Sequence, residues 1–120
     1  MAGFKHGRIT SDIQMALAEL LREVKDPRVS SLIGVVKVLV SGDLSYATVY
    51  VSAIEGYEAT LESVKGLKSA AGFLRRELGN RLKLRKVPEL RFVADDSIIK
   101  SAEIMNIIES FDHKEVVEED

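Results

Sequence analysis

The chain contains no cysteine, only two histidines and two prolines, and its charges nearly cancel at a formal net charge of −2. Without cysteine it forms no disulfides, thiolate zinc sites or cysteine nucleophiles, which fits a reducing compartment. No apolar run approaches the roughly 20 residues that cross a bilayer, and residues 1–10 lack the hydrophobic core of a secretory signal. With 120 residues, 46% of them hydrophobic, the sequence predicts one soluble, globular, cytoplasmic domain without a membrane partner.

The motifs of common enzyme classes are also missing. The sequence has no G-x-x-x-x-G-K-S/T phosphate loop, no G-x-G-x-x-G fingerprint, no H-E-x-x-H and no G-x-S-x-G. His6 lies near the terminus and His113 in an acidic tail, so no predicted rigid element positions either one. Asp95 and Asp96 are expected to shape a turn rather than to hold a metal ion. We therefore predict no enzyme activity, catalytic residue, metal site, cofactor or small-molecule substrate.

The positive charges are concentrated in one segment. Residues 65–91 contain nine lysines and arginines against two glutamates, whereas residues 112–120 carry four net negative charges. A local excess of this size attracts a polyanion, because screening limits electrostatic reach to about 8 Å at physiological salt. An ordinary solvated helix face fits the charge run equally well.

Apolar spacing predicts where the helices lie. From Ile9 onward apolar residues recur at steps of three and four, which predicts a first helix that Thr10 or Ser11 caps. Asp26-Pro27 ends it, because proline disfavours helical geometry in the preceding residue. A second helical stripe covers residues 59–82, and a short C-terminal helix is expected within residues 98–111.

Three segments are predicted to be strands. Residues 32–41 and 45–53 are rich in β-branched and aromatic residues and form a hairpin that turns at Gly42-Asp43, and residues 90–94 form a third strand. In the second strand Tyr46 and Tyr50 face away from the small apolar residues. This pattern fits cross-strand packing, and it also fits the stacking of nucleic-acid bases.

Small residues interrupt the second helical stripe at Ala70-Ala71-Gly72. We expect two helices to meet there at an angle, with room for another backbone to approach, although tight packing against the sheet explains small residues as well. Beyond the kink, helical spacing places Arg75, Arg76, Gly79 and Lys83 on one side. Gly72 and Gly79 would then let a sugar-phosphate strand approach the helix backbone, and the arginines would bind its phosphates.

These elements predict an α+β domain. Its order is helix, strand, strand, helix, kink, helix, strand and a short C-terminal helix, with the helices packed on one face of a three-stranded sheet. The domain is expected to cover residues 1–111, followed by an acidic, disordered tail at residues 112–120.

Four sequence blocks together resemble the bacterial ribosome-binding factor A family. They are Lys25-Asp26-Pro27-Arg28, residues 38–52 (VLVSGDLSYATVYVS), residues 70–76 (AAGFLRR) and residues 84–92 (LRKVPELRF). The resemblance covers residues 7–111 and implies a type II KH-like fold, in which an interhelical A-x-G kink replaces the G-x-x-G loop of ordinary KH modules. The chain contains no G-x-x-G, which agrees with that replacement.

The resemblance also implies a function. Members of the family are non-enzymatic assembly factors that bind the free small (30S) ribosomal subunit, assist maturation of the 5′ end of 16S rRNA and in many bacteria support growth in the cold. We expect the chain to act on these partners as a monomer. Two alternatives remain open, a general KH-like RNA-binding module and a protein-interaction domain whose basic face meets an acidic partner.

The predicted RNA-binding residues are the kink and the basic residues around it. They are Arg8, Lys68, Ala70, Ala71, Gly72, Arg75, Arg76, Arg81, Lys83, Arg85 and Lys86.

Overall fold

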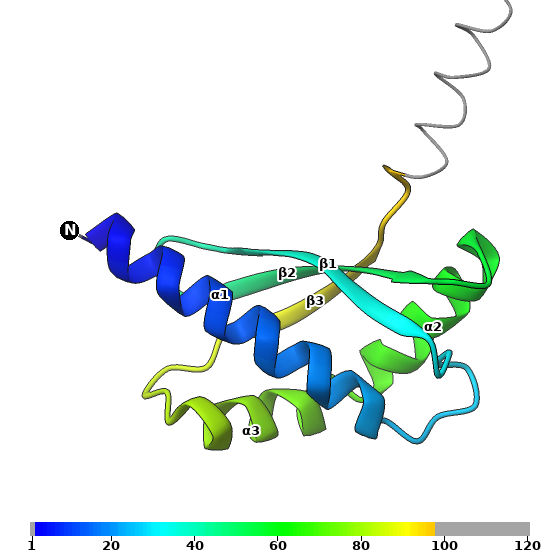
Figure 1. Ribbon diagram of the computed structural model, residues 1–120. Coiled ribbons are helices and arrows are strands. Elements are labelled where there is room, and N and C mark those ends of the chain that lie inside the picture. The colour runs from blue at the N-terminus through cyan, green and yellow to red at the C-terminus, as the bar shows by residue number, and fades with distance from the viewer. Residues whose placement is uncertain (1, 98–120) are drawn as a thin grey trace, which may run out of the picture.

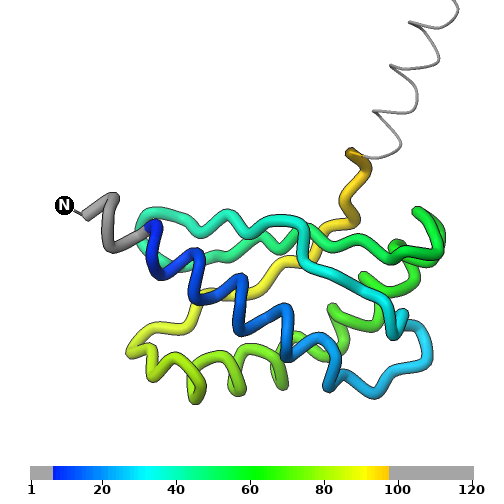
Figure 2. Tube along the Cα trace, viewed as in Figure 1, coloured from blue at the N-terminus to red at the C-terminus, as the bar shows by residue number. Residues whose placement is uncertain are grey.

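In the computed structural model, the backbone is described for residues 2–97 and the side chains for residues 7–97. The elements are α1 (Ala2–Leu20), the 3-10 helix η1 (Leu21–Glu23), β1 (Ile33–Val40), β2 (Tyr46–Ala53), α2 (Tyr57–Ser69), α3 (Ala71–Leu82) and β3 (Glu89–Ala94). Figures 1 and 2 show the three α-helices on one side of the sheet. The predicted α+β order of the type II KH-like fold is therefore confirmed as far as β3. The expected C-terminal helix and acidic tail lie outside the described residues.

The three strands form a single sheet in the order β1-β2-β3. The hairpin is antiparallel, as predicted, whereas β3 runs parallel to β2 because α2 and α3 carry the chain back across one face. The small apolar residues Ala47, Val49 and Val51 of β2 are fully buried. Their neighbours in β3, Leu90 and Phe92, point to the same side, so this face of the sheet forms the floor of the core.

The helices cover this face with leucine and isoleucine. Ile13 and Leu17 of α1, Leu67 of α2 and Leu74 and Leu78 of α3 are fully buried and belong to one apolar cluster with the sheet. Burying each such side chain contributes roughly 1.5–3 kcal/mol relative to leaving it in water. The core therefore fixes which side of each helix faces solvent.

The start of α1 differs from the prediction. The helix begins at Ala2, so Thr10 and Ser11 lie inside it and not at its start. Gly7 and Arg8 are exposed and Ile9 is only half-buried. They consequently carry no apolar stripe from which their helical state could be read.

Two buried hydroxyl groups on α2 hold neighbouring segments in place. Thr60 Oγ1 accepts a hydrogen bond from the Ala53 backbone N–H at 2.9 Å and donates to the Gly56 carbonyl at 2.8 Å. Ser63 Oγ accepts from the Ser30 N–H at 2.9 Å. The Thr60 hydroxyl thus joins β2 to α2, and the Ser63 hydroxyl joins the segment after α1 to α2.

Candidate nucleic-acid interface

Helix α3 carries the centre of the predicted interface, and its buried side determines what it presents to solvent. Leu74 and Leu78 have no exposed surface. Arg75 and Arg76 follow Leu74 directly and are both exposed. The cationic side of α3 thus faces solvent because the apolar side is held in the core.

The predicted kink lies between α2 and α3 at Ala70. Its backbone leaves helical geometry at φ −92° and ψ 4°. Its N–H still bonds to the carbonyls of Gly66 and Leu67, both at 3.1 Å, and its own carbonyl accepts from the Leu74 N–H at 2.9 Å. The two helices are therefore joined by one residue, and the kink is confirmed at the predicted place.

Of the two glycines predicted to let a sugar-phosphate strand approach, Gly72 has open space beside it and Gly79 does not. A Cβ atom added to Gly72 would meet no heavy atom within 4 Å, so tight packing does not explain this glycine. A Cβ on Gly66 would lie 2.5 Å from Val29 Cγ2, and one on Gly79 would lie 2.7 Å from Val87 Cγ2. Gly79 is thus filled by the chain's own Val87 and offers no approach to a sugar-phosphate strand. The open approach is at Gly72 alone of these three.

An ion pair from the loop after α1 braces the kink. Asp26 accepts hydrogen bonds from the Arg28 backbone N–H at 2.8 Å and from its guanidinium Nε and Nη2 at 3.1 and 2.8 Å. These bonds lower the pKa of Asp26 from 3.8 to about 2 and raise that of Arg28. Arg28 Nη2 also donates to Ser69 Oγ at 3.1 Å, beside Ala70. The bond from Arg28 to Ser69 joins residues 41 positions apart, so local sequence pattern carries no sign of it.

Three of the predicted phosphate-binding cations are bound within their own chain. Arg75 donates from Nε and Nη2 to the Val87 carbonyl at 3.2 and 2.9 Å. Arg81 forms ion pairs with Glu19 at 2.7 Å and Glu23 at 3.2 Å, which join α3 to α1 and η1. Both guanidinium groups are therefore held in place. The charge of Arg81 is balanced by two carboxylates, whereas Arg75 binds a neutral carbonyl.

Lys86 is the third of these cations. Its Nζ donates to the Asp43 carbonyl at 3.1 Å and to Ser45 Oγ at 3.4 Å, which attaches the loop after α3 to the hairpin turn. Hydrogen bonds from Ser45 and Ser41 lower the pKa of Asp43 to about 2, and the charge of Lys86 adds to this effect. The basic loop therefore lies against the end of the sheet.

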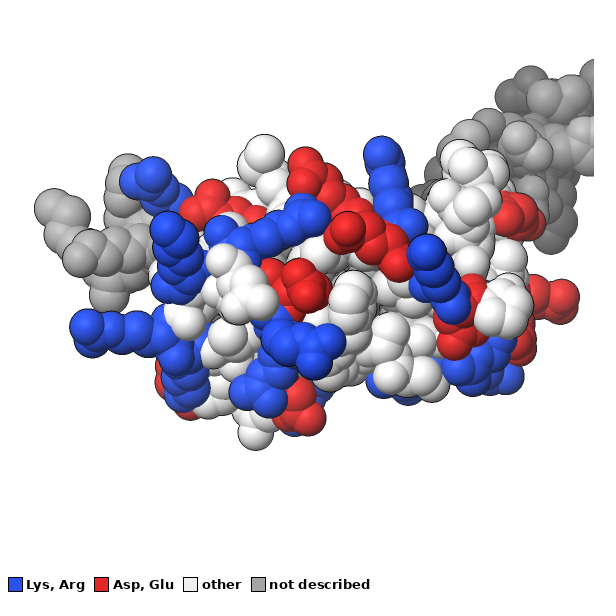
Figure 3. All heavy atoms as spheres, turned by 90° about the horizontal axis from the view of Figure 1, so that it is seen from below, with Lys and Arg blue, Asp and Glu red and all other residues white. Residues whose placement is uncertain are grey.

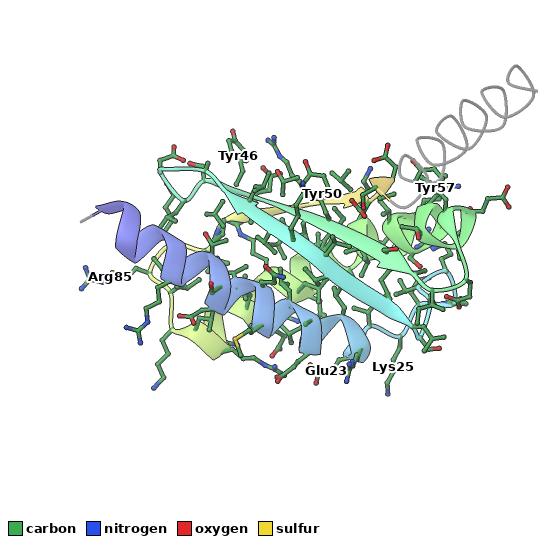
Figure 4. The ribbon with its side chains drawn as sticks, turned by 45° about the horizontal axis from the view of Figure 1, so that its top comes forward. Glu23, Lys25, Tyr46, Tyr50, Tyr57 and Arg85 are labelled. Carbon is green, nitrogen blue, oxygen red and sulfur yellow. The ribbon has the colours of Figure 1, made fainter. Side chains whose placement is uncertain are left out.

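The side chains of the remaining predicted cations make no hydrogen bond or ion pair within the described residues. They are Arg8, Lys68, Arg76, Lys83 and Arg85. Figure 3 shows basic side chains crowding the end of the molecule where α1 begins and α3 ends. Figure 4 shows Arg85 at this end, pointing away from the sheet. These groups have full hydrogen-bonding capacity for a ligand.

The interface is a stripe rather than a single pocket. Ala70-Ala71-Gly72 lies at the amino end of α3 and Lys83 at its carboxyl end, so about 18 Å of helix separates them at 1.5 Å per residue. Lys83 departs from the helical spacing that was predicted for it, because it adopts the left-handed conformation at φ 51°. Its N–H caps the helix by bonding to the Gly79 carbonyl. The chain turns there and directs residues 83–86 toward the hairpin.

Other kinds of site have no support in the described part of the chain. The described side chains, those of residues 7–97, include no cluster of three histidine, aspartate or glutamate residues that could hold a metal ion. Over the same residues, no helix combines the length and the apolar character needed to cross a membrane. Asp95 accepts a hydrogen bond from the Ser97 hydroxyl, a contact typical of a turn.

Comparison with known proteins finds proteins of similar sequence and fold. A family model described as Ribosome-binding factor A matches residues 5–108. Ribosome-binding factor A of Acetivibrio thermocellus is 46% identical over 102 residues, which cover 84% of this chain and 83% of that protein. The crystal structure of ribosome-binding factor A from Thermus thermophilus superposes with a TM-score of 0.65 at 31% identity, over 73% of this chain and 92% of that one. A homology model of the Thermus thermophilus factor, fitted into the cryo-EM map of a 30S complex, matches with a TM-score of 0.63 at 30% identity, over 74% and 93% of the two chains.

Proposed function

The chain belongs to the ribosome-binding factor A family, and from this premise we propose that it binds the free small (30S) ribosomal subunit through the basic stripe along α3. The observation that carries the proposal is the set of exposed cations without a partner among the described residues. Arg76, Lys83 and Arg85 are the members on α3 and the loop that follows it. A homologous factor has been fitted into a 30S complex, which supplies the class of partner.

The contacts proposed for the stripe are with RNA phosphates. Arginine guanidinium groups bind phosphate oxygens through paired hydrogen bonds, and lysine adds a point charge. Gly72 has open space where a side chain would lie, so a sugar-phosphate strand can reach the helix backbone beside Ala70 and Ala71. Phosphate contacts position a protein without reading sequence, so the shape of the folded 16S rRNA supplies the selectivity.

The proposed action requires no bond breaking by the protein. A factor that binds one RNA conformation better than its alternatives raises the population of that conformation. We propose that this conformation is the one in which the 5′ end of the 16S rRNA precursor matures, and that growth in the cold depends on it. The protein acts as a cytoplasmic monomer, without a cofactor.

Pelleting of purified small subunits with the chain tests the proposal. The triple variant Arg76→Ala/Lys83→Ala/Arg85→Ala is compared with Lys65→Ala, which removes an exposed cation that is already paired with Glu62 on α2. We expect the triple variant to lose most binding and Lys65→Ala to bind as the unsubstituted chain does. Equal binding by all three proteins would contradict the role of the stripe.

A further inference from the structure

The open face of the sheet, opposite the helices, carries two tyrosines that each lie against a cation. Lys37 Nζ lies 4.6 Å from the centre of the Tyr50 ring, and Arg91 Cζ lies 3.8 Å from the centre of the Tyr46 ring. Figure 4 shows both tyrosines on the upper side of the sheet, whereas Tyr57 lies apart from them on α2. The stripe along α3 uses none of these residues.

Strand pairing brings the four residues together from all three strands. Lys37 of β1 is paired with Tyr50 of β2, and Arg91 of β3 is paired with Thr48, next to Tyr46 on the same face. Tyr46 and Tyr50 are four residues apart in one strand, a separation of about 13 Å at 3.3 Å per residue. The face therefore presents two separate aromatic platforms, each with a positive charge.

We propose that this face binds an unpaired stretch of RNA, with bases stacked at Tyr46 and Tyr50 and phosphates bound by Lys37 and Arg91. The proposal rests on the proposed function, because it adds a second RNA contact to the same factor. Aromatic rings on a sheet stack bases of any sequence, and a guanidinium plane can do the same. Bases in a duplex are already stacked on one another, so this face selects single-stranded RNA.

Charge favours RNA over an apolar protein segment as the occupant. The three strands contain one acidic residue, Glu89, at the start of β3. Its Oε2 lies 3.7 Å from Arg91 Nη2. Lys37 has no ion pair among the described residues, so an apolar partner covering this face would take its charge out of water without a counter-charge, which is costly. A nucleic-acid strand supplies both flat rings and negative charges.

The basic loop after α3 connects the two surfaces. Lys86 bonds to Ser45, and the Ser45 carbonyl accepts the Glu89 N–H at 2.9 Å, at the end of the sheet where Tyr46 lies. Cations therefore continue from the carboxyl end of α3 around the hairpin turn to Arg91. An RNA chain that leaves the stripe at Arg85 can therefore reach the open face past Lys86 and Arg91, with the Asp43 and Glu89 carboxylates beside these two cations.

Fluorescence anisotropy with a short labelled oligouridine tests the proposal, with a labelled duplex RNA of the same length as the second probe. Tyr46→Ala and Tyr50→Ala are each expected to weaken oligouridine binding by about 5- to 150-fold, the effect of losing one base–aromatic stack. Tyr46→Phe and Tyr50→Phe keep the ring and should bind normally. Tyr57→Ala, which removes a similarly exposed tyrosine from α2, should also bind normally. Duplex binding should not change in any variant.

Three results would overturn the proposal. They are an unsubstituted chain that does not bind oligouridine, alanine variants that bind it normally, and an equal loss in the phenylalanine variants. Sedimentation equilibrium adds a fourth, a dimer that the alanine variants abolish, because the face would then bind a second copy of the chain. If oligouridine binding fails while the chain still pellets with small subunits, only this inference is lost, and loss of pelleting counts against the proposed function itself.

Discussion

Substituting two glycines with alanine separates packing from ligand access at the kink. In Gly66→Ala the new methyl group would lie 2.5 Å from Val29 Cγ2 and 3.2 Å from Asp26 Cγ, so the loop after α1 must shift. Overpacking of this kind costs about 1–3 kcal/mol, and the gain in helix propensity returns about 1 kcal/mol. We expect Gly66→Ala to lower the free energy of unfolding by up to about 2 kcal/mol.

Gly72→Ala should have the opposite effect on stability. Its methyl group meets nothing within 4 Å, and the residue lies in the first turn of α3. Replacing an exposed helical glycine by alanine stabilises by about 0.5–1 kcal/mol. The same methyl group blocks the approach of an RNA strand, so small-subunit binding should weaken although the fold becomes more stable.

Urea unfolding followed by circular dichroism measures the stability of both variants, and pelleting with purified small subunits measures the binding of Gly72→Ala. Gly66→Ala with stability raised by about 1 kcal/mol, the full gain in helix propensity, would refute the close packing between α2 and the loop. Gly72→Ala that binds subunits as well as the unsubstituted chain would refute RNA contact at Ala70-Ala71-Gly72.

Three further predictions concern charge and backbone conformation. The pKa of Asp26 lies at about 2, below its ordinary 3.8, so the stability that its ion pair contributes is present above about pH 4 and lost as the pH falls toward 2. Carboxyl NMR titration should show this pKa rising in Arg28→Ala, and an unchanged value would contradict the brace. In a plot of the logarithm of the subunit-binding constant against the logarithm of the salt concentration, the slope should become shallower by about 0.7–0.9 for each of Arg76, Lys83 and Arg85 replaced by alanine. A binding constant that does not depend on salt would exclude phosphate contacts. Lys83→Gly should raise the thermal unfolding midpoint, because glycine adopts φ 51° without strain, and a lower midpoint would show that the lysine side chain stabilises the turn.

Most of the fold is predictable from local sequence pattern. The alternation of Ala47, Val49 and Val51 with larger outward residues predicts the buried face of β2, and these three residues are fully buried. The row of apolar residues through Leu74 and Leu78 continues across the kink because both helices pack on the same sheet. Such periodicity records burial directly, which is why it locates core elements.

The parts that pattern could not predict depend on contacts distant in sequence. Gly7 and Arg8 of α1 are exposed, so no apolar stripe marks the helix there. Charge counting treated Arg81 as a free cation, because its partners Glu19 and Glu23 lie about sixty positions earlier in the chain. Gly79 looked accessible because nothing in its helix shows that Val87 covers it. Sequence alone identifies a basic residue as a candidate for phosphate binding. The fold then shows whether a carboxylate or carbonyl of the same chain already binds it.

The central claim, association with free small ribosomal subunits, is tested most directly by sedimentation. Tagged chain is mixed with cell extract, separated on a sucrose gradient and detected in each fraction, with and without prior nuclease treatment. We predict that the chain migrates with free small subunits, is missing from full ribosomes and returns to the top of the gradient after nuclease treatment. A nuclease-resistant complex away from small subunits would indicate a protein partner. Migration with RNA of every size would indicate a general RNA-binding module. Either result would contradict the account.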